Sequence, residues 1–94
     1  METRLALIGI VVEDVNSVEK LNSILHQFGS YIIGRMGIPY HKRQISIISV
    51  AVDAPANIIS TLSGKLGMLP GVSSKVVYSK YSLKSGDDNN ESAD

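Results

Sequence analysis

With 94 residues and no cysteine, the chain is long enough for one small domain and has neither a disulfide framework nor thiolate metal ligands. Nine basic side chains balance nine acidic ones, but four of the acidic residues follow Ser85, so residues 1–84 carry nine minus five, or +4. This excess is small beside the dense basic surface of a nucleic-acid-binding domain, and we expect no direct nucleic-acid contact.

The apolar segments are too short for a membrane protein. The longest run, Leu5 to Val12, falls far below the roughly 20 residues that span a bilayer, and no charged leader precedes a cleavable apolar segment. We therefore expect a soluble, cytoplasmic protein without membrane contact. Residues 1–84 are predicted to form a single domain. Residues 85–94 are acidic and nearly free of apolar side chains, which predicts a disordered, solubilising tail.

The first expected element is a strand from Arg4 to Val12. Its alternating side chains form two sets, and both sets are apolar. A strand of this kind is typical of the middle of a sheet that is buried on both faces.

A helix is predicted from Val15 to Phe28, because apolar residues recur every three or four positions, with Gly29 as its stop. The residues of this stripe are Val15, Val18, Leu21, Leu25 and Phe28. Two caps are compatible with the start of the helix. Asp14 can cap it directly, or Asn16 can form a capping box with Glu19, and the sequence does not choose between them.

The segment from Tyr31 to Tyr40 is expected to form a bent or bulged edge strand, because two glycines and a proline interrupt its apolar residues. The polar residues 41–44 join it to the apolar run 45–52, which predicts a hairpin. The basic tip of this hairpin, Tyr40-His-Lys-Arg43, is typical of charged turns that prevent edge-to-edge aggregation.

Asp53-Ala-Pro55 is expected to open a second helix, because proline suits the first helical turn. Its apolar face consists of Ile58, Ile59, Leu62 and Leu66. We expect Gly67 to adopt the left-handed conformation that ends a helix. Pro70-Gly71 then turns the chain into a last strand that runs from Val72 to near Leu83.

This order predicts an α+β fold, a ferredoxin-like βαββαβ sandwich in which two helices cover one face of a four-stranded antiparallel sheet. The first and third strands are central in this arrangement. The uncovered face then exposes either Leu5, Leu7 and Val11 or Ala6, Ile8 and Ile10. Such a face is unusual on a soluble monomer, so we expect a second copy to cover it.

Three segments carry a resemblance to a known family: Ile10-Val-Val-Glu-Asp14, Gly34-Arg-Met-Gly-Ile-Pro39, and Leu62-Ser-Gly-Lys-Leu-Gly67 followed by Pro70-Gly-Val72. They resemble the small ACT-like family named for regulation of the iron-only hydrogenase system, over roughly residues 4–83. The resemblance implies a ferredoxin-like fold related to ACT domains and to the ligand-binding half of the nickel-responsive regulator. It also implies assembly as a homo-oligomer, a dimer or a tetramer. The metal-binding residues of the nickel regulator have no counterparts here.

Two places are candidates for binding a small effector. Gly34, Arg35 and Gly37 can bring backbone N–H groups and a guanidinium to an anionic ligand, whereas the simpler alternative is a glycine-kinked edge strand with a solvated arginine. ACT domains bind effectors at subunit interfaces near the first strand–helix loop, so the resemblance implies a role for Glu13 and Asp14. Their alternative role is that of charges at a helix start.

Other chemistry finds little support in the sequence. His26 and His41 are the two imidazoles, too few for a metal site of three or four ligands, and we expect no metal and no cofactor. No arrangement of Ser, His and Asp is spaced as a catalytic triad.

We predict a non-enzymatic, ACT-like regulatory or sensing module that forms homo-oligomers and binds a small effector at subunit interfaces. The alternative is a structural interaction module that docks a partner protein through its sheet face.

Overall fold

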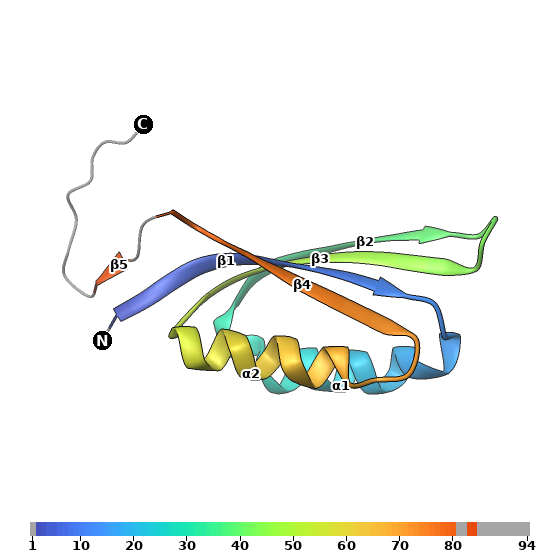
Figure 1. The fold of residues 1–94 in the computed structure, drawn as a ribbon, viewed down its shortest axis with the longest axis horizontal. Helices are drawn as coiled ribbons and strands as arrows, with labels where there is room; N and C mark the ends of the chain where they lie inside the picture. Colours follow the sequence, from blue (N-terminus) through green and yellow to red (C-terminus); the bar gives the residue numbers. More distant parts are fainter. Residues whose placement is uncertain (1, 81–82, 85–94) are drawn as a thin grey trace.

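The computed structural model describes residues 2–80 and 83–84, and the predicted tail, residues 85–94, lies outside them. A sheet lies over a layer of two helices (Figure 1). The strands are β1 (Glu2–Val12), β2 (Ile32–Tyr40), β3 (Ile45–Ala54), β4 (Val72–Tyr78) and the short β5 (Leu83–Lys84). The α-helices are α1 (Val18–Gln27) and α2 (Ala56–Gly67), and 3-10 turns occupy Val15–Ser17 and Gly29–Tyr31.

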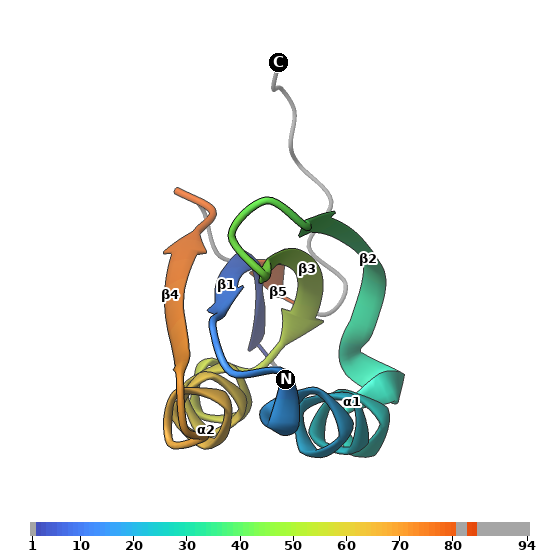
Figure 2. The same ribbon diagram turned by 90° about the vertical axis from the view of Figure 1, so that its right-hand side faces the viewer.

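The main sheet has the order β2-β3-β1-β4, and all its neighbouring strands are antiparallel. Both α-helices lie on the same face of this sheet (Figure 2). The predicted order of elements and the central positions of the first and third strands are confirmed. The fold is therefore a ferredoxin-like α+β sandwich.

The register of β1 decides which of its two apolar sets faces the helices. Ile8 pairs with Val50 on β3 and with Val76 on β4. Ala6, Ile8, Ile10 and Val12 are exposed by 8% or less of their surface, whereas Leu7 is 47% exposed. The even-numbered set thus builds the core, and the odd-numbered set faces away from the helices.

The core lies between the even-numbered face of the sheet and one stripe on each helix. The stripes contribute Leu21 and Leu25 from α1 and Ile59, Leu62 and Leu66 from α2, all buried. This agrees with the three- and four-residue spacing in the sequence. Each fully buried aliphatic side chain contributes about 1.5 to 3 kcal/mol, so the core holds the helices firmly to this face.

The connection between β1 and α1 begins with a capped 3-10 turn. The backbone N–H of Asn16 donates to Asp14 Oδ1 at 2.9 Å, so Asp14 provides the cap and the alternative capping box is not used. The predicted helix from Val15 is therefore a 3-10 turn that continues into α1. Gly29 follows α1 as predicted and continues into a second 3-10 turn.

The expected left-handed conformation of Gly67 is wrong, because this glycine is the last residue of α2. The left-handed glycine is Gly71, with φ of 68°. At the end of the helix, the N–H of Met68 donates to the carbonyl of Gly64. The turn that follows is closed by a hydrogen bond from Val72 N–H to the carbonyl of Leu69 at 3.2 Å. Proline followed by glycine at the two middle positions is typical of a type II turn, which needs positive φ at the glycine.

The expectation that the last strand ends near Leu83 is also wrong. Strand β4 ends at Tyr78, where Ser79 N–H donates to the carbonyl of Leu5 at 2.8 Å. The backbone then returns as the separate β5, which pairs antiparallel with Glu2 and Thr3. No glycine or proline marks this break, so the alternation of side chains alone did not locate it.

Candidate functional site

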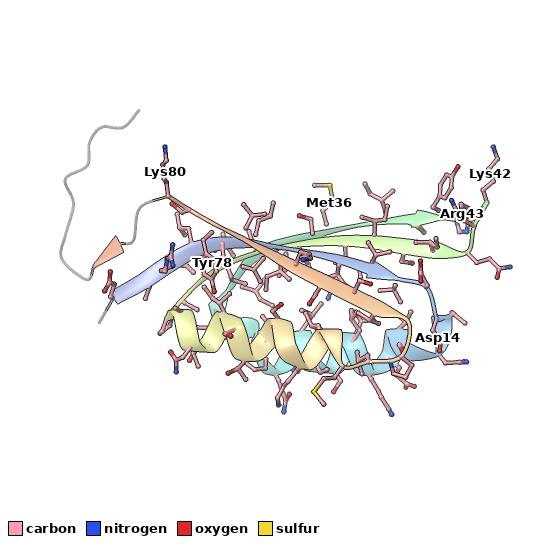
Figure 3. All side chains as sticks on the ribbon, viewed as in Figure 1. Asp14, Met36, Lys42, Arg43, Tyr78 and Lys80 are labelled. Atoms are coloured by element: carbon pink, nitrogen blue, oxygen red, sulfur yellow. The ribbon has the colours of Figure 1, made fainter. Side chains whose placement is uncertain are left out.

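The face of the sheet that points away from the helices, here called the outer face, is apolar and open. Met36 projects from it in Figure 3. The large apolar side chains of this face are between 36% and 67% exposed. They are Leu7, Val11, Met36, Ile38, Tyr40, Ile47 and Val77. Contiguous exposed apolar surface is a common feature of interaction sites.

The strand register arranges these side chains in rows across the sheet. Val11 pairs with Ile47, which pairs with Ile38, so three strands contribute to one apolar ridge. Leu7 and Val77 are paired in a second ridge. Directly opposed side chains on neighbouring strands lie about 4.5 to 5.5 Å apart, close enough to form a continuous surface.

A row of mixed side-chain sizes separates the two ridges. Gly9 pairs with Ser49 on one side and with Lys75 on the other. A Cβ atom built on Gly9 would meet nothing within 4 Å, so the space above its backbone is open. The row is thus small only at Gly9 and Ser49. It ends in two long exposed side chains, Lys75 on β4 and Met36 on β2, which pairs with Ser49.

A hollow of about 500 Å³ lies between the β2–β3 hairpin and the connection from β1 to α1. Its lining residues are Val12, Val15, Val18, Pro39, Tyr40, His41, Gln44, Ile45 and Ser46. The walls are mainly apolar, and a few side chains supply polar groups. Small-molecule sites typically have this composition and volumes of about 300 to 1,000 Å³.

Glu13 and Asp14 lie beside this hollow. Their chain neighbours Val12 and Val15 form part of its wall. The Asp14 carboxylate caps the 3-10 turn, and Glu13 N–H donates to the carbonyl of Gly71 at 2.7 Å. Asp14 thus has the helix-start role that the sequence offered as an alternative, and an effector contact at either residue stays a prediction.

Gly34 and Arg35 lie on opposite faces of edge strand β2, next to a register shift between Ile32 and Gly34, which confirms the bulged edge strand. Arg35 is on the helix side, where its Nη2 donates to Asn22 Oδ1 on α1 at 3.0 Å. Gly37 is near the core, because a Cβ there would lie 3.9 Å from Ile48 Cγ1.

Arg35 lies on a different part of the surface from Glu13 and Asp14. It lines a hollow of about 350 Å³ together with Asn22 and His26 of α1. The structure therefore brings Arg35 to the middle of α1, whereas the two acids lie at its start. The predicted residues occupy two separate surfaces.

Sequence reasoning missed the hairpin side of the larger hollow. Tyr40, His41 and Gln44 were interpreted only as parts of a charged turn. They meet the β1–α1 connection because Val12 pairs with Ser46, the second residue of β3. Gln44 has φ of 55° in the hairpin turn, and no local pattern in the sequence indicates this conformation.

Within residues 2–80 and 83–84, no three His, Asp or Glu side chains lie close enough together to hold a metal ion. Neither helix of the same part has the length and apolar character needed to cross a membrane.

The two-layer fold, with one covered and one open apolar face, defines a small ferredoxin-like α+β domain. A family model described as "TM1266-like: Iron-only hydrogenase system regulator, putative" matches residues 4–76, and the chain belongs to this family. The resemblance predicted from the sequence is thereby confirmed.

A solved structure, described as "uncharacterized protein TM1266 from Thermotoga maritima", is similar with a TM-score of 0.80 and 33% sequence identity. The alignment covers 83% of this chain and 99% of that one. A search of curated proteins found no match. The family match includes both helices and the strands as far as Val76, so the acidic residues 85–94 are outside it.

Proposed function

We propose that the protein is a non-enzymatic regulatory module that works as a homo-oligomer and binds a small effector close to the subunit boundary. The description of its family as a regulator supports the regulatory role. The open apolar outer face is the observation that carries the proposal of assembly.

The size of the outer face favours association. A large aliphatic side chain gains about 1.5 to 3 kcal/mol when it is fully buried, and a symmetric pair buries each residue twice. Even half of this gain, summed over the residues of the outer face, matches an association cost of about 4 to 15 kcal/mol.

The shape of the outer face favours a second copy over an unrelated partner. The ridge with Leu7 and Val77 and the ridge with Ile47 lie on either side of the small residues Gly9 and Ser49. A two-fold axis in the plane of contact allows the apolar side chains of each copy to pack over the small residues of the other. Docking of a different protein on this face is the alternative.

We place the effector in the hollow of about 500 Å³, which lies beside Glu13 and Asp14. Its apolar wall and the polar groups of Tyr40, His41 and Gln44 suit a small molecule with an apolar body and a polar head. Arg35, with Gly34 and Gly37 on the same strand, remains a proposed contact for an anionic effector on the β2 side, where its bond to Asn22 is exposed.

Light scattering of wild-type protein and two lysine variants tests the assembly. We expect the wild type to be at least a dimer at micromolar concentration. Leu7→Lys should be folded by circular dichroism but smaller in mass, because Leu7 lies on the outer face. Ile8→Lys should unfold, because Ile8 is 0% exposed and the charge would enter the core.

Gln27→Lys is the matched control, because Gln27 is exposed on α1, in the helix layer on the other side of the sheet. It should keep the mass of the wild type. A monomeric wild type would disprove the homo-oligomer and leave docking of a different protein as the better explanation of the outer face.

A further inference from the structure

The charges of this chain are divided between the domain and the segment that follows it. Asp87, Asp88, Glu91 and Asp94 give residues 85–94 a charge of −4, and residues 1–84 carry nine minus five, or +4. The acidic segment lies beyond the family match, which ends at residue 76. Because the segment and the domain carry opposite net charges, a basic surface of the same protein is a candidate binding site for the segment.

The exposed basic side chains Lys42 and Arg43, together with His41, form the tip of the β2–β3 hairpin. This tip and β5, from which residues 85–94 continue, lie at opposite ends of the molecule (Figure 1). Lys80 lies at the β5 end, and both Lys80 and Lys42 point away from the helix layer (Figure 3).

The acidic segment cannot bind the tip of its own subunit with most of its charges. The β5 end and the tip are separated by at least the length of β1, whose 11 residues span about 33 Å. Glu91 lies seven residues beyond Lys84, which corresponds to at most about 25 Å at full extension. Asp87 and Asp88 reach less far.

Two copies that pack through their outer faces can be oriented in two ways. With like ends together, Lys42 and Arg43 of one copy lie against the same two cations of the other. With opposite ends together, the tip of each copy lies at the β5 end of the other, next to Lys80 and the start of the acidic segment. The second orientation also brings Lys80 and Lys84 near each tip, but the four acidic residues of the segment outnumber these two lysines. Only this orientation therefore places a net negative charge beside both tips.

We infer that residues 85–94 of each subunit bind the hairpin tip of the other subunit, in a pair packed through the outer faces with opposite ends together. This inference rests on the proposed homo-oligomer. His41 lines the large hollow as well as the tip. The acidic segment of one subunit would therefore lie at the rim of the effector site of the other, and effector binding would be linked to assembly.

The first test neutralises the segment in the full chain by Asp87→Asn, Asp88→Asn and Glu91→Gln. The dissociation constant of the dimer should rise roughly ten-fold or more at low salt, because two contacts are lost in each dimer. At about 0.5 M salt the difference from wild type should nearly vanish, because screening weakens exposed charge pairs. Glu19→Gln, at an exposed acid of α1, is the control and should leave the dissociation constant of the dimer unchanged at both salt concentrations.

Charge reversal tests whether the acidic segment and the hairpin tip contact each other directly. Lys42→Glu with Arg43→Glu should weaken the dimer as strongly as the neutralised segment does. Adding Asp87→Lys and Asp88→Lys to the same chain should restore affinity to within about three-fold of wild type, since the pair is then reversed and not removed.

The absence of cysteine allows the orientation to be tested by disulfide formation. A Lys42→Cys chain mixed with a Ser85→Cys chain should form a cross-linked heterodimer under mild oxidation. Rapid cross-linking of the Lys42→Cys chain to itself would show like ends together and would overturn the inference.

The outcomes separate this inference from the proposed function. A wild-type dimer whose dissociation constant is unchanged by neutralising the segment overturns the inference and leaves the homo-oligomer intact. A monomeric wild type overturns both.

Discussion

Leu7 and Ile8 are neighbours in the same central strand and have the same apolar character, yet they have opposite surroundings. Ile8 is 0% exposed beneath the helices, whereas Leu7 is 47% exposed on the outer face. Their difference arises from the position of the helix layer and not from their own chemistry. An apolar residue on the open side of such a strand therefore reports a surface available to another molecule, and one on the closed side reports the core.

The two edges of the sheet differ in the same respect. Strand β4 alternates between exposed residues and residues that are buried or partly buried, as expected for one covered face. Strand β2 is exposed at every residue after Ile32, so the helices leave even its inner side open to solvent. The difference in side-chain exposure between the covered and the open face is therefore largest at β1 and smallest at β2.

The largest effect is expected where a core side chain is truncated. Ile10→Ala should lower the free energy of unfolding by about 2 to 5 kcal/mol, because Ile10 is 0% exposed and a cavity would remain. Val77→Ala, at a residue 67% exposed on the outer face, should cost less than about 1 kcal/mol in dilute protein. Urea denaturation measures both. An equal loss at Val77 in dilute protein would contradict the assignment of the outer face as open.

A smaller effect is expected at the turn that joins the helix layer to the sheet. Gly71→Ala should destabilise the domain by about 1 to 2 kcal/mol or more, because Gly71 has positive φ and its Cβ would lie 2.6 Å from Asp14 Cβ. Gly67→Ala should be neutral or stabilising by up to about 1 kcal/mol, because Gly67 is helical and its Cβ would lie 3.4 Å from Ser74 Oγ. Thermal unfolding of the two variants compares them directly. The reverse order would place the left-handed residue at Gly67.

The smallest effect is expected on the exposed inner side of β2. Arg35→Ala removes one exposed hydrogen bond to Asn22 and should change the free energy of unfolding by less than about 0.5 kcal/mol. This makes it a clean variant for a thermal-shift screen with amino acids and nucleotides. A ligand that stabilises the wild type but not the variant would identify Arg35 as an effector contact, whereas equal stabilisation would exclude it.

Much of the fold followed from periodicity, because Leu21 and Leu25 on α1 and Ile59 and Leu62 on α2 repeat at helical spacing and are buried. The orientation of β1 did not follow. Both of its side-chain sets are apolar, and only the pairing of Ile8 with Val50 places one set beneath the helices.

The left-handed glycine shows the same limit of local patterns. Gly67 follows Leu66 in α2, whereas Gly71 follows Pro70 in the turn after the helix, and each is compatible with a reversal of the chain. The Pro70-Gly71 pair favours the second position locally. Tertiary packing supports it, since Ser17 Oγ donates to the carbonyl of Pro70 at 2.6 Å and holds this turn against the start of α1. A contact between residues so far apart in the chain leaves no signal in either segment.

The candidate site was predictable only on one side. The first strand–helix connection was expected at the site because of the family resemblance, and the hollow does lie beside Glu13 and Asp14. The opposite wall, with Tyr40 and His41, depends on how β3 aligns with β1. A shift of one residue in this register would reverse the faces of the strand, so the composition of the wall cannot be read from the hairpin alone.

The pairing of β1 has a consequence for how the protein is made. This strand is synthesised before its partners β3 and β4, which begin only at Ile45 and Val72. Its apolar residues therefore stay unpaired at least until β3 has been synthesised, and unpaired apolar strands of this kind are prone to aggregation. The sheet can be completed only after β4 has been synthesised, and contacts between such distant segments make this step slow relative to formation of the helices.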